Sequence, residues 1–403
     1  MPAFPDGGLL RGAGVMERQR LLAAEGLFDV ESGEDLFGPD VAIRTSIDTL
    51  TITSGQDGRY AVLRTGCLDN GRAVFEGYWH GPRDSTFGLI RLWGRDAQGG
   101  AALCNGTPLQ AGDDWQLSGT YGEGEKAPSV VVSLRRTAPL KPFRGRFFSI
   151  GHRGACENTD DCGPSSNGLA SFRLTDQIGA NAVEMDLHLT RDGVPVIFHD
   201  ASLSGSLVEG AFCRGEIADT SLAELRANCT LQNGEPFPTL EEALRTVIDE
   251  TELELMYLDT KAAAVVEVMI PMVRAENERA RKKGRLFRAL VGLPKEAVTD
   301  AWKATDTTGV PCLLEYDLDL ALELGCVAWG PTWTAGPLVA DVERAHAAGL
   351  GVFYWTMTQS NFIQDFLEQA KPEGFVTSRT GMVFYLYQKY GTVPEPWLFP
   401  EAP

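Results

Sequence analysis

The chain has 403 residues, of which 43% are hydrophobic and 23% charged, so we expect a globular protein with one large domain and one smaller domain. Its formal net charge of −19 argues against binding to nucleic acid or to anionic membrane surfaces, because both are bound through Lys and Arg. No run of about 20 apolar residues predicts a transmembrane segment, and no signal peptide is visible at the N-terminus.

Residues 1–140 predict a small all-β domain of unknown role. The first 35 residues are loop-like apart from one expected helix, Gly14–Gly26. Short β-rich runs between Gly, Asp and Asn turn signals then follow, a spacing typical of a β-sandwich or a small barrel, and we take the domain as sandwich-like. The expected runs are Val41–Ile52, Tyr60–Arg64, Ala73–Trp79, Phe87–Trp93, Trp115–Tyr121 and Val130–Arg135.

Residues 145–395 alternate apolar runs with amphipathic helical segments, the pattern of βα units around a parallel sheet. Eight runs predict a TIM-type (β/α)8 barrel; a doubly wound open sheet is the alternative, but no Gly-rich dinucleotide motif follows a strand. Residues from about 200 to 238 form an insertion after the second strand. The expected strands are Phe147–Gly151, Ala182–Leu189, Leu255–Thr260, Ala289–Leu293, Cys312–Asp317, Val327–Gly330, Gly351–Thr356 and Gly374–Thr377. The expected helices are Leu169–Ile178, Leu240–Asp249, Ala264–Lys283, Lys295–Thr305, Val339–Ala348 and Phe362–Ala370.

The eight cysteines fall into neighbouring pairs, which favours disulfides and an oxidising compartment, extracellular or periplasmic. The pairs are Cys67 and Cys104, Cys156 and Cys162, Cys213 and Cys229, and Cys312 and Cys326. We expect disulfides above all in the second and third pairs, because their loop-like surroundings offer a buried thiol little core to join. Buried free thiols are the alternative. A zinc site is not expected, because no Cys-x-x-Cys pair is present.

Three acidic residues lie near the carboxyl ends of two expected strands, where barrel active sites are built. Glu184 and Asp186 are two residues apart on one strand, so their side chains point to the same face. Asp259 lies near the end of the next strand. Three carboxylates at one barrel mouth would repel one another unless a cation lay between them. Oxygen ligands favour one hard divalent cation, Ca²⁺ or Mg²⁺, over zinc.

Two of the five histidines, His152 and His199, end apolar runs and should lie at the same rim as the acids. Two imidazoles beside a cation suit a general acid and a general base near neutral pH. Arg153 and Lys261 supply the positive charge that a phosphate needs inside an acidic protein. His188 shares a face with the two acids of its strand, but we assign it no catalytic role.

These pieces resemble, in the same order, the signature of the glycerophosphodiester phosphodiesterase family of the PLC-like phosphodiesterase superfamily. The resemblance covers roughly residues 147 to 385. The matching motifs are Gly151-His152-Arg153-Gly154, Glu184-Met185-Asp186, Thr190-Arg191-Asp192-Gly193, His199-Asp200, Asp259-Thr260-Lys261, Trp355-Thr356 and Gly374-Phe375-Val376-Thr377. The third acid is commonly Glu in this family, whereas Asp259 resembles the related sphingomyelinase D and phospholipase D toxins.

The resemblance implies a metal-dependent phosphodiesterase that releases glycerol 3-phosphate and an alcohol from glycerophosphodiesters. It implies these roles: metal ligands Glu184, Asp186 and Asp259; acid/base pair His152 and His199; phosphate contacts Arg153 and Lys261. Trp355 would form an apolar wall beside the substrate, with plain core packing as the alternative. Asn167 would contact the phosphate or the metal shell, with Asn158 as the alternative.

The departure at the third acid leaves alternatives open for the substrate. One is a phospholipase D-like, sphingomyelinase D-like or lysophospholipase D activity on lipids. A non-catalytic binding protein is a separate alternative for the function, although it predicts the loss of a metal acid or a histidine and none is missing. The attacking group is either the substrate's own glycerol 2-hydroxyl, which gives a cyclic phosphate, or water. The expected partner is a small-molecule or lipid phosphodiester, and the oligomeric state is left open.

Overall fold

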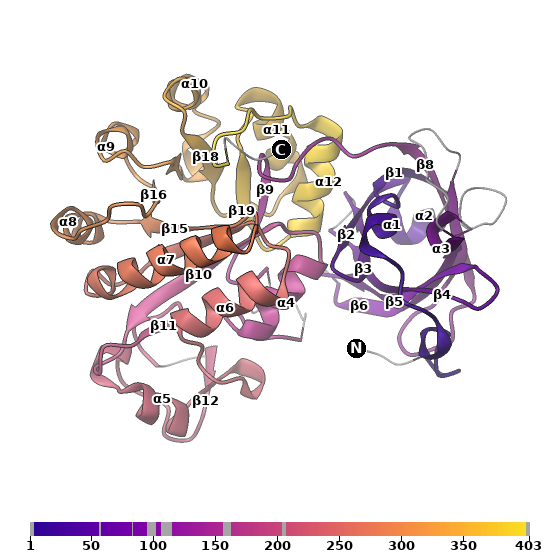
Figure 1. The fold of residues 1–403 in the computed structure, drawn as a ribbon, viewed down its shortest axis with the longest axis horizontal. Coiled ribbons are helices and arrows are strands. Elements are labelled where there is room, and N and C mark those ends of the chain that lie inside the picture. The colour runs from indigo at the N-terminus through magenta and orange to yellow at the C-terminus, as the bar shows by residue number, and fades with distance from the viewer. Residues whose placement is uncertain are drawn as a thin grey trace. The chain divides into compact units, whose positions relative to one another are not determined.

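The computed structural model describes residues 4–55, 58–82, 84–94, 102–105, 115–155, 163–203 and 207–399. The chain forms two compact units (Figure 1). The first comprises residues 1–141, 177–179 and 380–390, and the second comprises residues 142–176, 180–379 and 391–403. No helix in the described ranges is long and apolar enough to cross a membrane.

The first unit is built around a closed antiparallel barrel in which each strand pairs with the next and β8 returns to β1. The all-β expectation is confirmed, and its form is a barrel rather than a sandwich, which leaves no unpaired edge. The strands are β1 (Gly26–Ser32), β2 (Asp40–Ser46), β3 (Thr49–Ser54), β4 (Tyr60–Cys67), β5 (Ala73–Gly81), β6 (Thr86–Gly94), β7 (Gln116–Tyr121) and β8 (Val130–Ala138). Fully buried apolar side chains fill its interior, and the rings of Phe28 and Trp115 meet edge to face at 5.5 Å.

Two expectations for the first unit are wrong. The N-terminal helix is only the short α1 (Arg18–Leu22), and residues expected to form a loop instead form strand β1, whose alternating burial is the period of a half-buried strand. The run Val41–Ile52 is not one strand but the hairpin of β2 and β3, which turns at Ile47 with φ 35°. The turn contains no Gly or Pro, so the sequence carried no turn signal there. Short helices α2 (Glu34–Phe37) and α3 (Ala102–Asn105) were not expected.

The second unit contains the expected (β/α)8 barrel, with eight parallel strands closed by the pairing of β9 with both β19 and β10. The strands are β9 (Phe148–Gly151), β10 (Ala182–Leu189), β14 (Leu255–Thr260), β15 (Arg288–Leu293), β16 (Cys312–Leu314), β17 (Ala328–Trp329), β18 (Gly351–Tyr354) and β19 (Gly374–Thr377). A ninth strand, β11 (Pro195–Ile197), folds back antiparallel on β10.

The expected helices are present in the alternating βα pattern (Figure 1). They are α4 (Leu169–Gln177), α6 (Leu240–Glu250), α7 (Val265–Lys282), α8 (Glu296–Ala304), α10 (Val339–Ala347) and α11 (Ser360–Gln369). Two further helices follow strands without having been expected, α9 (Leu318–Glu323) and α12 (Thr380–Tyr390), and α12 is grouped with the first unit.

The insertion after β11 has a small apolar core of its own. It contains helix α5 (Leu222–Asn228), begun by a capping box between Ser221 and Glu224, and the strand pair β12 (Val208–Glu209) and β13 (Thr230–Leu231). The disulfide Cys213–Cys229 ties its two halves together, as expected.

Two more of the cysteine pairs form disulfides. They are Cys67–Cys104 and Cys312–Cys326. The pair Cys156 and Cys162 lies outside the described residues.

Candidate metal and phosphodiester site

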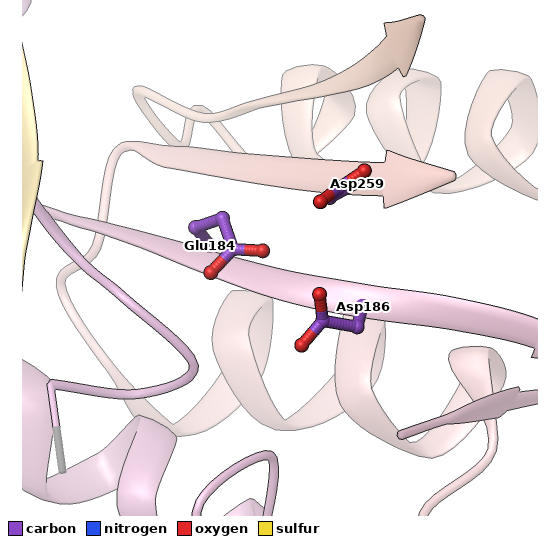
Figure 2. Close-up of side chains that lie close together, drawn as sticks. All are labelled: Glu184, Asp186 and Asp259. Carbon is purple, nitrogen blue, oxygen red and sulfur yellow. The ribbon is translucent and has the colours of Figure 1, made fainter. Parts of the chain in front are cut away.

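Three carboxylates on two adjacent strands converge near the carboxyl ends of the strands in the second unit's barrel. Glu184 and Asp186 lie on β10, and Asp259 lies on β14 directly opposite Asp186 in the register (Figure 2). Each offers an oxygen within 4.8 Å of the others. Glu184 and Asp186 are buried, and the side chain of Asp259 is 13% exposed. The sequence expectation that these acids share one face is therefore met in the structure.

Burial and mutual repulsion shift the pKa values of the three acids. Burial raises the pKa of Glu184 well above its usual range, and the charges of Asp186 and Asp259 raise it further. Burial likewise raises the pKa of Asp259, although Lys261 opposes the shift. Burial would also raise the pKa of Asp186, but the positive charges of Lys261 and Arg153 outweigh it and lower that pKa.

The acids fit a divalent cation. Two cationic side chains face three carboxylates, so the cluster has an excess of negative charge when all three acids are ionised. Oδ1 of Asp259 is buried and accepts no hydrogen bond from any described residue, which is costly for a carboxylate oxygen without a ligand. A hard cation would satisfy that oxygen and offset the repulsion from Asp186 and Asp259 that contributes to the raised pKa of Glu184.

Arg153 and Lys261 lie against the same carboxylates. The main-chain N–H of Arg153 donates to Glu184 at 2.9 Å, and its Nε lies 3.3 Å from Oδ2 of Asp186. Arg153 adopts φ 52° in the turn after β9, which aims both groups at the acids. The ammonium of Lys261 lies 3.0 Å from Oδ1 of Asp186 and also donates to Asp259. Both cations are thus beside the carboxylates, where an anionic ligand would meet them.

The two histidines differ in how they are held. His152 follows β9, its main-chain N–H donates to Thr377 at 2.9 Å, and its Nε2 lies 4.0 Å from Oε2 of Glu184. Nδ1 of His199 lies 2.6 Å from a carboxylate oxygen of Asp200. Because an ionised carboxylate only accepts, that nitrogen carries the proton and Nε2 is left to exchange one.

Asn167 joins the site through Asp186. Its side-chain NH₂ donates to Oδ2 of Asp186 at 2.7 Å, and its carbonyl oxygen accepts the main-chain N–H of Asp186 at 3.3 Å. It is 2% exposed, and its own main-chain N–H donates to Arg153. Asn167 therefore holds a candidate metal ligand, while the alternative, Asn158, lies outside the described residues.

His188 has a contact that the sequence did not reveal. Its Nε2 lies 3.0 Å from the main-chain carbonyl of His199, to which it donates. Burial lowers the pKa of His188, which favours the neutral form of the ring. His188 thereby ties β10 to the residue just before the insertion. Its position on the same face as Glu184 and Asp186 was the signal in the sequence.

A fourth acid at the mouth, Glu315, was not predicted from the sequence. It follows β16 and accepts a hydrogen bond from the hydroxyl of Tyr257 on β14. Burial, with the charge of Asp259, raises the pKa of Glu315 to about 8. Trp355 follows β18, packs against the apolar core of the barrel, and donates its indole N–H to Gly330 at 2.6 Å. Trp355 thus combines core packing with a place beside the mouth.

Comparisons with known proteins give one consistent result. The model of the glycerophosphoryl diester phosphodiesterase family matches residues 152–382. The "Probable glycerophosphodiester phosphodiesterase 2" of Mycobacterium tuberculosis is 27% identical over 233 residues, 54% of this chain and 83% of that protein. The human glycerophosphodiester phosphodiesterase 1 is 34% identical over 122 residues, 28% of this chain and 34% of that protein. A crystal structure of a glycerophosphodiester phosphodiesterase from Parabacteroides distasonis has a TM-score of 0.46 and 19% identity, covering 58% of this chain and 95% of that one.

Proposed function

Because the chain belongs to the glycerophosphoryl diester phosphodiesterase family, we propose that it hydrolyses glycerophosphodiesters to glycerol 3-phosphate and an alcohol with the help of one divalent cation. The observation that carries the proposal is the buried group of Glu184, Asp186 and Asp259, with its oxygens within 4.8 Å of one another. All-oxygen ligands make the cation Ca²⁺ or Mg²⁺. When bound, it would polarise a phosphoryl oxygen and neutralise the charge that develops there.

His199 and His152 exchange the protons of the reaction. Nε2 of His199 is the proton-exchanging atom, since Nδ1 is engaged with Asp200. His152 is the second member of the pair, close to Glu184. One imidazole removes the proton from the attacking hydroxyl, and the other gives a proton to the departing alcohol, so this step exchanges the protonation states of the two rings. Opening of the cyclic phosphate with reversed roles, or proton exchange with solvent after direct attack by water, restores them.

The remaining site residues bind and orient the phosphate. Arg153 and Lys261 contact its oxygens with charge-assisted hydrogen bonds and share the developing negative charge. Asn167 keeps Asp186 in place through its two hydrogen bonds. Trp355 forms an apolar wall beside the substrate.

The hydroxyl that attacks is either water or the 2-hydroxyl of the substrate's own glycerol. In both cases the bond between phosphorus and the alcohol oxygen breaks, and the alcohol leaves with a proton. The glycerol hydroxyl gives a cyclic phosphate that a second step opens with water. Phosphorus NMR of the reaction distinguishes the routes, because only the second route passes through the cyclic ester.

We also propose residues 145–395 as the catalytic domain and residues 1–140 as a separate domain. His199 is held by Asp200, at the start of the insertion at 200–238, and by His188 on β10. An extracellular or periplasmic location is supported by the disulfides Cys67–Cys104, Cys213–Cys229 and Cys312–Cys326. Alkylation without and with prior reduction, followed by mass spectrometry, tests the bridges. Alkylation of these cysteines without reduction would remove the support for that location.

The experiment that tests the activity is phosphorus NMR on a panel of glycerophosphodiesters with the full chain. Reactions contain Ca²⁺, Mg²⁺ or excess EDTA. We expect glycerol 3-phosphate with at least one cation and none with EDTA. Turnover that is equal in EDTA would contradict the metal role, and no turnover of any glycerophosphodiester under any condition would contradict the function.

A further inference from the structure

A surface pocket of about 440 Å³ lies at the amino ends of two barrel strands of the second unit. Leu350 and Glu373, which line it, directly precede β18 and β19. Further lining residues come from the end of α10, the turn after α11 and the C-terminal segment 392–397. The three carboxylates of the metal site lie near the carboxyl ends of their strands, at the opposite end of the barrel. The pocket is therefore separate from the proposed active site, and we call it the amino-end pocket.

The wall that the C-terminal segment forms is anchored to the barrel. The indole N–H of Trp397 donates to the main-chain carbonyl of Arg146 at 3.4 Å, and Nη1 of Arg146 donates to the carbonyl of Pro394 at 2.9 Å. The indole packs on Gly351, where a Cβ would lie 2.7 Å from the nearest ring atoms, so the ring lies this close only because the residue is glycine. It also meets the ring of Phe353 edge to face at 5.4 Å. The amino-end pocket is therefore bounded by packed and hydrogen-bonded chain.

A buried carboxylate in the amino-end pocket has one oxygen without a protein donor. Glu373 is 6% exposed, and its Oε2 accepts hydrogen bonds from the main-chain N–H of Val352 at 2.7 Å and from Nε2 of His346 at 3.1 Å. Its other oxygen, Oε1, accepts no hydrogen bond from any described residue. A carboxylate oxygen largely removed from water needs a donor. Glu373 therefore favours a ligand that carries a hydroxyl or an N–H group.

Two exposed side chains of opposite charge line the same pocket. Neither the ammonium of Lys371 nor the carboxylate of Glu395 forms an ion pair with any residue that the structure describes. Since Glu373 is paired with His346, these two side chains set the balance of charge. A ligand with a full charge would be attracted by one of them and repelled by the other. A hydroxyl group can accept a hydrogen bond from the ammonium and donate one to a carboxylate, so the charges favour a neutral ligand rich in hydroxyls.

The apolar part of the amino-end pocket suits the C–H groups of a sugar ring. The indole of Trp397 is partly exposed, and Pro396 and Leu350 add further apolar surface. A sugar ring can pack its C–H groups on an aromatic side chain while its hydroxyls reach polar groups at the edge. Small-ligand pockets span about 300–1,000 Å³, so this one has room for roughly one or two such rings. A purely apolar ligand of that size would leave Oε1 of Glu373 without a donor.

We propose that the amino-end pocket binds a neutral saccharide of about one or two rings. The C–H groups of one ring pack on Trp397. Its hydroxyls donate to Oε1 of Glu373 and to Glu395, and they accept from the ammonium of Lys371. No covalent bond is made or broken there. The site uses a part of the barrel that the proposed phosphodiesterase reaction does not use, so the two proposals stand or fall separately.

The test is saturation-transfer NMR on the full chain in EDTA, with saccharides and charged small molecules as probes. The saccharides are glucose, galactose, mannose, N-acetylglucosamine, maltose, cellobiose and lactose, and the charged probes are choline and acetate. We expect saturation transfer to at least one saccharide, strongest at the C–H protons of one ring, and none to choline or acetate. Lys371→Ala and Glu395→Gln should each weaken the affinity for that saccharide about tenfold, because each removes a hydrogen bond to a charged group.

Lys303→Ala and Glu296→Gln are the matched controls, because both residues are exposed on α8 and neither lines the pocket. Both controls should keep the original affinity. Unchanged affinity in both pocket variants would overturn the proposal, since the saccharide would then be bound elsewhere. Absence of saturation transfer to every saccharide would also overturn it. Transfer to choline or acetate alone would overturn it in favour of a site for a charged ligand.

Discussion

Asp186 and Asp259 are register partners on the adjacent parallel strands β10 and β14, so their carboxylates leave the sheet side by side at the same height. Glu184 reaches the same face from one strand period earlier (Figure 2). Lys261 lies one period beyond Asp259 and pairs with both aspartates. Two neighbouring strands therefore position the three acids and Lys261, and the loops bring Arg153 and the histidines to them.

Asp259→Asn should weaken binding of Ca²⁺ or Mg²⁺ more than tenfold, because it removes one of three anionic ligands. Isothermal titration calorimetry on the chelator-treated protein measures this affinity. Asp300→Asn, at an exposed position on α8, is the matched control and should bind the cation as the original chain does. Equal affinity in the two variants would exclude Asp259 as a ligand.

His152→Ala and His199→Ala should each lower kcat for a glycerophosphodiester by a factor of about 10²–10⁴, the usual contribution of a positioned acid or base. Neither histidine is a proposed metal ligand, so the affinity for the cation should change little. His346→Ala, at the other end of the barrel helices, controls for loss of a histidine elsewhere. Turnover near the original rate in either variant would remove that histidine from the mechanism.

Asp200→Asn tests whether the carboxylate beside His199 positions the ring. The amide can offer Nδ1 a donor instead of an acceptor, which would favour the wrong tautomer. We expect kcat to fall at least tenfold while KM and cation affinity stay nearly constant, with partial recovery in Asp200→Glu. A fall in thermal stability that accounts for the whole loss of activity would indicate a structural role instead.

Much of the site could be predicted from the sequence because its residues lie near the ends of strands and follow the two-residue repeat of a strand. Glu184, Asp186 and Asp259 are positioned by the two-residue repeat of a strand, which is a local property. The βα alternation is local as well, and it sufficed to predict the barrel. Asn167 could be ranked above Asn158 from its distance to the helix that follows, and the structure brings it to Asp186.

The contact of His188 with His199 and the place of Glu315 at the site were not predicted, because both depend on how the fold brings separate segments together. His188 meets the carbonyl of His199 only because β11 folds back on β10, and Glu315 meets Tyr257 only because the barrel closes. The closed form of the first unit likewise depends on the pairing of β1 with β8, about a hundred residues apart. No local sequence pattern specifies these pairings. The alternation of buried and more exposed residues along β1, in contrast, is a local pattern and was visible in its sequence.

A histidine away from the site should make stability depend on pH. Nε2 of His346 lies 3.1 Å from a carboxylate oxygen of Glu373, and this hydrogen bond raises the pKa of His346 above the ordinary 6.5. The imidazolium is therefore stabilised in the folded chain. Its contribution is fully present below the ordinary pKa of histidine, and it is lost as the pH rises through the raised value.

His346→Gln should lower the thermal midpoint at about pH 5.5 and have little effect at about pH 9. The difference in unfolding free energy should be about 1 kcal/mol or less, because the pair is partly exposed to solvent. Lys371 lines a surface pocket together with His346 and Glu373. Lys371→Gln therefore removes a positive charge from the same pocket without removing the hydrogen bond, and it should show no such pH dependence. Thermal unfolding curves recorded in EDTA across this pH range test the prediction. A loss of stability in His346→Gln that grows with pH would contradict the pairing of His346 with Glu373.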